Sequence, residues 1–254
     1  MVTQFKELTD SQWQVIEDLF PEQEYCDLNL QTVLSAIFWI LRTGSQWRNL
    51  DSKFPKWQSV YYHFRKWKKD GRLLLMNERL NEVERLRQKR NAKPSMVMVD
   101  SQSVKISSLI KEETGYDGGK KIKGRKRHIV TDTLGLVIGV LITSANQADG
   151  QCGVKLFSGV ERLLVKVKKV LADGSYGGVF QEYIDGIIEP ELEISSRPPS
   201  EKGFVPIKFR WVVERTFGWF NFFRRLDKDH EKTPESSAAF VILANCAVII
   251  NRII

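Results

Sequence analysis

The sequence is poor in the residue types that build disulfide frameworks and thiolate or imidazole metal sites. Its 254 residues include three cysteines and three histidines. Cys26, Cys152 and Cys246 are far apart and odd in number, which supports neither a disulfide framework nor a zinc cluster. The histidines are scattered singly, so we interpret them as surface or core residues. We therefore expect a reducing cytoplasm as the setting, and oxygen ligands for any metal.

Long hydrophobic runs are missing too. No charged segment followed by an apolar one stands at the N-terminus, and the most apolar run, residues 238–250, is interrupted by Asn245. That run is too short to span a bilayer. We expect a soluble protein that is not exported and has no membrane partner.

Positive charge, in contrast, is abundant. Lysine and arginine number 39 against 31 aspartates and glutamates, which gives a net charge of +8 and a pI near 9.3. Residues 53–93 hold 13 basic and 4 acidic residues, whereas residues 1–52 hold 3 basic and 8 acidic ones. A local excess of cations is typical of a surface that binds nucleic acid.

Residues 1–93 predict a helical domain. The spacing of apolar residues favours helices at about residues 10–20, 28–41, 55–69 and 72–90, with Gly44 ending the second. The third helix interleaves aromatic residues with cations, and the layout resembles a helix-turn-helix. Its candidate DNA contacts are Lys56, Arg65, Lys66, Lys68 and Lys69. The alternative is a solvated basic face on a structural helix.

Residues 94–254 predict a mixed sheet with flanking helices, which makes the whole chain α+β. Strands are expected at about residues 96–99, 126–131, 136–144, 167–172 and 187–194. The first three should form an antiparallel meander. A crossover helix at 149–165 makes the fourth strand parallel to the first. Asp149 is interpreted as the N-cap of this helix, with a role as a further acid of the site as the alternative. Asp100 and Asp173, at the ends of these two strands, then point into one crevice.

A basic segment precedes the second strand, in what we expect to be a loop. Its cations are Lys120, Lys121, Lys123, Arg125, Lys126 and Arg127. We expect them to contact phosphates, and a solvated loop without a ligand is the alternative.

A helix over residues 210–225 carries a further acid. Most of its surface is apolar, so it should pack against the sheet or another helix. Glu214 is either paired with Arg210 at i, i+4 spacing or a metal ligand. Arg210 and one of Arg224 and Arg225 would contact phosphate. On the same stripe Gly218 would leave room for a ligand, while Asn221 has no assigned role.

Two strand-end aspartates and a glutamate on a facing helix provide the oxygen ligands that a hard divalent cation prefers. Two Mg²⁺ ions about 4 Å apart activate an attacking oxygen and stabilise the leaving one in a displacement at phosphorus. Asp100, Asp173 and Glu214 are therefore the expected metal ligands and catalytic residues of nuclease or strand-transfer chemistry.

These motifs, in this order, resemble a bacterial insertion-sequence transposase of the DDE type, specifically the IS-five-like group. The resemblance rests on these segments: residues 8–13 with Ile16, 99–104, 123–130, 132–135, 172–177 and 210–220 with Arg224 and Arg225. In the family's third-acid region, Ile207 and Asn221 stand where a tyrosine and a lysine are usual. Only 40 residues separate Asp173 from Glu214, which leaves no room for a large insertion domain.

The resemblance implies an RNase H-like catalytic domain and two Mg²⁺ ions, with Mn²⁺ as a substitute. It implies cleavage at inverted-repeat transposon ends and joining of the 3′-hydroxyl to target DNA. Double-stranded DNA is then the partner, and a homodimer would pair the two ends in the bacterial nucleoid. Two alternatives stay open: an RNase H-like nuclease that only hydrolyses, and an inactive DNA-binding repressor derived from a transposase.

Overall fold

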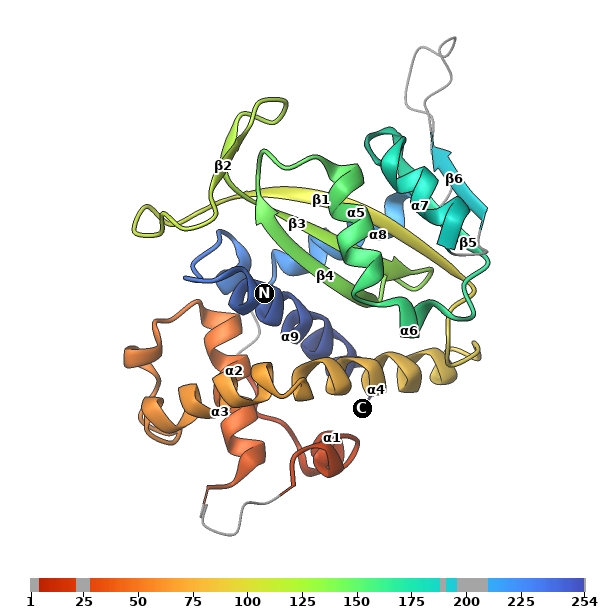
Figure 1. The fold of residues 1–254 in the computed structure, drawn as a ribbon. Coiled ribbons are helices and arrows are strands. Elements are labelled where there is room, and N and C mark those ends of the chain that lie inside the picture. Colours follow the sequence, from red (N-terminus) through yellow and green to blue (C-terminus); the bar gives the residue numbers. More distant parts are fainter. Residues whose placement is uncertain (1–4, 22–27, 188–190, 196–209, 254) are drawn as a thin grey trace.

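The computed structural model describes residues 5–21, 28–187, 191–195 and 210–253. In this part of the chain a group of N-terminal helices is followed by a sheet with helices on both faces (Figure 1). The α+β class expected from the sequence is confirmed. The N-terminal elements are α1 (Asp10–Gln14), η1 (Glu17–Leu19), α2 (Leu30–Thr43), η2 (Trp47–Asn49), α3 (Trp57–Lys69) and α4 (Arg72–Arg87).

Capping residues define the ends of the first helices. The Thr9 hydroxyl accepts a hydrogen bond from the backbone N of Gln12 at 3.3 Å, and the Gln12 side chain accepts one from the backbone N of Thr9 at 3.0 Å. α2 ends at Gly44, whose φ is 71°, as predicted. The predicted single helix at 10–20 is wrong. α1 stops at Gln14 because the backbone of the buried, β-branched Ile16 leaves helical geometry.

Six described strands form one sheet in the order β2–β3–β1–β5–β6, with β4 also paired to β3. They are β1 (Met96–Lys105), β2 (Gly115–Asp117), β3 (Ile122–Asp132), β4 (Val137–Ser144), β5 (Lys169–Asp173) and β6 (Glu191–Ser195). β1, β3 and β4 form the predicted antiparallel meander, and β5 is parallel to β1. The strand predicted at 187–194 begins later, at Glu191, because Ile187 still belongs to the preceding helix.

The sheet has a hydrophobic core on each face. One core, with Val97, Val99 and Val170, lies under α5 (Asp149–Ser158), α6 (Glu161–Leu164) and α7 (Val179–Ile187). The other, with Ile129 and Val137, is shared with the N-terminal helices, α8 (Arg210–Phe220) and α9 (Pro234–Ile253). Figure 1 shows α5 and α7 in front of the sheet and α8 and α9 behind it. The helix predicted at 149–165 is thus two helices, separated at Gly159.

α4 and α9 lie along one another and hold the N-terminal helices on the sheet (Figure 1). Asn77 and Asn81 of α4 both donate to the carbonyl of Val137 at 2.8 Å. Asn245 of α9 donates to the side-chain oxygens of both asparagines, at 2.7 and 3.0 Å. Buried amides that are satisfied in this way fix the relative position of the two helices and β4.

α9 is long and apolar enough, by length and composition alone, to cross a membrane. It extends beyond the apolar run seen in the sequence, from Pro234 to Ile253, and 67% of its most apolar window is buried. Its contacts with α4, α2, α8 and β4 place it in the hydrophobic core.

Candidate active site

Asp100 lies in the middle of β1, not at its end as predicted. The strand continues to Lys105 because the polar residues after Asp100 remain paired with β3. Val97 and Val99 are buried under α5 to α7, so the alternation of side chains directs Asp100 to the opposite face, where α8 contacts β1. The carboxylate is half-buried, and its Oδ1 accepts a hydrogen bond from the backbone N of Ser101 at 2.7 Å.

Asp173 ends β5, as predicted, and lies on the same face of the sheet as Asp100. Val97 pairs with Val170 in parallel register, and both are buried in the core under α5 to α7. Each acid is three residues further along its strand, so both carboxylates point away from that core. Oδ1 of Asp173 accepts hydrogen bonds from the backbone N of Ser175, at 2.9 Å, and from its hydroxyl.

Glu214 is exposed on α8, the helix that covers this face. Val213 and Phe217 anchor α8 in the core that it shares with α9. The helix that carries Glu214 therefore lies on the sheet face to which Asp100 and Asp173 point. The alternative partner for Glu214, Arg210, has a side chain outside the described part of the structure.

The predicted helix over 210–225 is too long. α8 ends at Phe220, and Arg224 begins a separate 3₁₀ turn, η4 (Arg224–Leu226). Trp211 and Phe222, expected on the buried face, are 56% and 62% exposed. Asn221, a weak helix former, is exposed just after the helix. Residues beyond Phe220 thus do not follow the predicted helical stripe.

Asp100 and Asp173 share a face of the sheet, but the three acids do not form a closed cluster. Among the described residues, no three histidine, cysteine or acidic side chains are placed to hold a metal ion together. The donor set nevertheless suits a hard cation, because all three are carboxylates. Both bonds from Ser175 go to Oδ1 of Asp173, and an ionised carboxylate has about four acceptor sites on its two oxygens.

Asp149, a further acid candidate that the sequence led us to interpret as a helix N-cap, has a different role in the structure. The sequence pattern indicates a helix N-cap, but the N-cap of α5 is Ala148, and no side chain caps this end. The carboxylate turns towards the sheet. Its Oδ1 accepts a hydrogen bond from the Ser101 hydroxyl at 2.9 Å and pairs with Lys126 Nζ at 3.1 Å. Ser101 alternates with Asp100 along β1, so this contact lies on the other face of the sheet.

His128 and Tyr176 complete this polar group. His128 Nδ1 is 3.4 Å from the Tyr176 hydroxyl and 3.6 Å from Asp149 Oδ1, and its Nε2 is 3.0 Å from the Thr143 hydroxyl. Burial lowers the pKa of His128 to about 4, against the opposing effect of Asp149. Burial also raises the pKa of Tyr176, helped by the charges of Asp149, Asp100 and Asp173. Tyr176 therefore stays a protonated donor close to all three aspartates.

Two protein-family models match the sequence of this chain. A family model described as "Transposase DDE domain" matches residues 91–250, and one described as "Putative transposase of IS4/5 family" matches residues 8–76. The chain belongs to the DDE transposase family. The resemblance predicted from the motifs is confirmed, and the domain that carries the sheet is RNase H-like.

A bacterial protein with a related sequence also matches. It is described as a putative transposase for insertion sequence element IS402, from Burkholderia cepacia, and is 31% identical over 139 residues. The match covers 51% of this chain and 64% of the relative, so the chain spans less than two thirds of that protein's length. No solved structure matches the chain.

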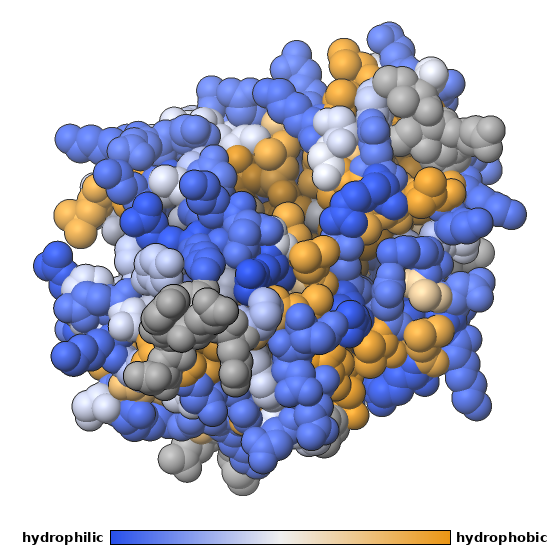
Figure 2. Space-filling view, turned by 60° about the horizontal axis from the view of Figure 1, so that its bottom comes forward, coloured by the Kyte–Doolittle hydropathy of each residue, from blue (hydrophilic) through white to orange (hydrophobic). Residues whose placement is uncertain are grey.

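Most cations predicted to contact DNA in this transposase-family chain are accessible. They are Lys120, Lys121 and Lys123 near the β2–β3 turn, Lys56, Arg65 and Lys69 on α3, and Arg224, all exposed, with Lys66 and Lys68 half-buried. Figure 2 shows the end of the molecule that is lowest in Figure 1, where hydrophilic residues cover most of the surface and hydrophobic ones lie between them.

Four predicted DNA contacts are corrected by their burial. Arg125, Lys126, Arg127 and Arg225 are at most 8% exposed. Arg125 donates to the carbonyl of Glu231 at 2.8 Å, Arg127 to that of Leu226 at 2.9 Å, and Arg225 to the Glu231 carboxylate at 2.7 Å. Residues 122–127 of the expected loop form the first half of β3. Arg125 and Arg127 hold η4 and the segment after it against the sheet, and Arg225 joins η4 to Glu231 in that segment. The side chain of Arg210 lies outside the described residues.

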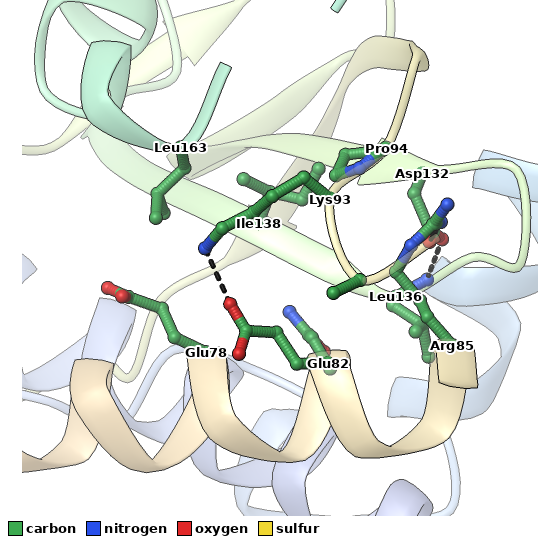
Figure 3. Close-up of a pocket in the computed structure, with 11 residues that line it drawn as sticks. Glu78, Glu82, Arg85, Lys93, Pro94, Asp132, Leu136, Ile138 and Leu163 are labelled. Atoms are coloured by element: carbon green, nitrogen blue, oxygen red, sulfur yellow. Dashed lines mark hydrogen bonds and ion pairs between the residues drawn. The ribbon is translucent and has the colours of Figure 1, made fainter. Parts of the chain in front are cut away.

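A pocket between α4 and the β3–β4 turn does not belong to the active site (Figure 3). Two ion pairs, Arg85–Asp132 and Lys93–Glu82, are part of the pocket lining. None of the three acids lines this pocket. With about 30 Å³ of space it has room for about one water molecule. We interpret it as a packing defect beside α4.

Proposed function

We propose that the chain is an insertion-sequence transposase that cleaves DNA at inverted terminal repeats and joins the freed 3′-hydroxyl ends to target DNA. The observation that carries the proposal is the common placement of Asp100 and Asp173 on the sheet face covered by the Glu214 helix. The family membership supports the same reaction class.

Asp100, Asp173 and Glu214 would hold two Mg²⁺ ions, with Mn²⁺ as a substitute. When bound, the ions supply activation of the attacking oxygen and stabilisation of the leaving oxygen. The two aspartates would be fixed by the strands, and Glu214 would approach from α8. Because the carboxylates are not yet grouped in the described structure, we expect cation and DNA to draw them together, as in many sites that tighten with substrate.

The DNA would contact the exposed cations. Lys120, Lys121 and Lys123 lie at the end of the sheet where Lys105 of β1 pairs with Gly124 of β3. α3 presents a second basic group. We divide the chain into a helical DNA-binding domain, residues 1–93, and a catalytic domain, residues 94–254, a division supported by the separate matches at 8–76 and 91–250. A homodimer in the bacterial cytoplasm would pair the two transposon ends.

The test is an assay with purified protein, Mg²⁺ or Mn²⁺, and duplexes that carry the sequences flanking the gene. We expect cleavage at the repeat end followed by covalent joining to a second duplex, and loss of both steps in Asp100→Asn. Hydrolysis without a joined product would instead identify a nuclease. Binding of DNA without either reaction would identify a repressor.

A further inference from the structure

The backbone pairing between β1 and β5 stops before it reaches the two aspartates. The described register joins Met98 to Leu171 as its last pair, two residues short of Asp100 and Asp173. On its other edge β5 remains paired with β6 as far as Asp173. The β1–β5 ladder therefore ends two residues before Asp100 and Asp173.

Side chains on the reverse face of the sheet connect the backbone next to Asp100 with the turn after Asp173. Ser101 directly follows Asp100, and Tyr176 lies in η3 (Gly174–Tyr176), the turn that follows Asp173. The Ser101 hydroxyl donates to Asp149 Oδ1, and the Tyr176 hydroxyl lies 3.4 Å from His128 Nδ1, which is itself 3.6 Å from the same Asp149 oxygen. The Tyr176 ring is fully buried and packs against Phe180 at a centroid distance of 5.6 Å, so its hydroxyl has a fixed position.

Asp149, in α5, is the hydrogen-bond acceptor for the Ser101 hydroxyl. Asp149 Oδ1 accepts a hydrogen bond from the Ser101 hydroxyl at an O–O distance of 2.9 Å. Lys126 Nζ lies 3.1 Å from the same carboxylate and also donates to the carbonyl of Gln147 at 3.0 Å. His128 lies within 3.6 Å of the same carboxylate oxygen. The Asp149 and Lys126 side chains are only 16% and 9% exposed, so water competes weakly for these contacts.

We propose that Asp149, acting through the Ser101 hydroxyl on one side and through His128 and the Tyr176 hydroxyl on the other, is a positioning residue that sets the separation of Asp100 and Asp173 for metal binding. This inference rests on the proposed function, because it takes Asp100 and Asp173 as metal ligands. Asp149 itself stays on the far face of the sheet and does not touch the metal. Substitution of a residue that orients a metal ligand without touching the metal commonly weakens metal binding by about 10-fold to 100-fold.

The test uses the full chain and two small substitutions, Asp149→Asn and Ser101→Ala. Asp185→Asn is the matched control, because Asp185 is an exposed aspartate on the neighbouring helix α7. Direct Mn²⁺ binding is measured by calorimetric titration without DNA, and the Mg²⁺ dependence of end cleavage is measured separately. We expect about 10-fold weaker Mn²⁺ binding in both variants. The maximal cleavage rate at saturating Mg²⁺ should change much less, and the control should behave as wild type.

The outcomes separate this inference from the proposed function. If Asp100→Ala loses Mn²⁺ binding but Asp149→Asn and Ser101→Ala bind as tightly as Asp185→Asn, the positioning role is refuted and the metal site stands. If Asp100→Ala binds Mn²⁺ like wild type, the metal site and the inference that rests on it both fail. Should Asp149→Asn not fold, Ser101→Ala decides, since it removes one hydroxyl and leaves the charges in place.

Discussion

Arg85 of α4 forms an ion pair with Asp132, at the end of β3, and both side chains are at most 7% exposed. Oδ1 of Asp132 also accepts hydrogen bonds from the backbone N of Leu134 and of Leu136, each at 2.9 Å. Burial raises the pKa of Asp132, while these partners oppose that shift. The ion pair fixes α4 to the turn between β3 and β4 (Figure 3).

We predict that Arg85→Ala lowers the free energy of unfolding by about 3 to 5 kcal/mol, because it leaves a buried carboxylate without its cation. Urea denaturation measures this loss. The control is Arg79→Ala, which removes an exposed pair with Asp18 and should cost at most about 1 kcal/mol. Equal losses in the two variants would contradict the importance of burial.

The exposed cations near the β2–β3 turn should act on DNA affinity and not on stability. For Lys121→Ala with Lys123→Ala we predict weaker binding to any duplex, and a salt dependence reduced by about 0.9 for each phosphate that the variant no longer neutralises. Filter binding at several salt concentrations measures the slope. Lys166→Ala with Lys168→Ala changes two exposed lysines near the opposite end of β1 and should leave both quantities unchanged.

Arg125 should behave in the opposite way. Its guanidinium is fully buried, pairs with Asp229 at 3.3 Å, and donates to carbonyls of residues 112, 231 and 232. Arg125→Met should therefore lower the midpoint of thermal unfolding markedly, since several carbonyls and one carboxylate lose their donor. At a temperature where the variant is folded, we expect wild-type DNA affinity. A normal midpoint together with weakened DNA binding would instead support a direct DNA contact by Arg125.

His128 should make the protein less stable in mild acid. Its folded pKa of about 4 lies below the unfolded value of about 6.5, so between these pH values the unfolded chain binds more protons. The free energy of unfolding should therefore fall, by of order 3 kcal/mol, as the pH is lowered from about 6.5 to 4. Burial also lowers the pKa of His63, which adds to the same slope.

The measurement is urea denaturation as a function of pH for the wild type and two variants. His128→Gln should show a reduced slope in this window, whereas His230→Gln, at an exposed position, should keep it. A slope that is unchanged in His128→Gln would show that the histidine is not held neutral.

Much of the fold was predictable because the signals are local. The apolar period, Asn29 as a cap and Gly44 define α2, and the turn at Gly135 defines the β3–β4 hairpin. The parallel pairing of β1 with β5 followed from the crossover helix. The first two features depend on residues close together in the chain, and the parallel pairing follows from the general rule for crossover connections.

The errors arose where distant residues decide the outcome. Arg125 and Arg127 have the composition of a solvated loop, and they are buried because carbonyls about 100 residues later satisfy them. Asp149 stands where an N-cap is usual, but its partners come from β1 and β3. Asp100 and Asp173 could be placed on one face from the alternation of side chains, whereas the spacing of the carboxylates required tertiary contacts.

The most direct measurement is strand transfer by a pre-cleaved transposon end, with wild type compared with Asp100→Asn, Asp173→Asn and Glu214→Gln at equal DNA occupancy. If the three carboxylates form one metal site, each variant should join ends at least about a thousandfold more slowly, since several kcal/mol of transition-state stabilisation are lost. Circular dichroism should show each variant folded. Joining at the wild-type rate by any of the three would contradict the shared metal site.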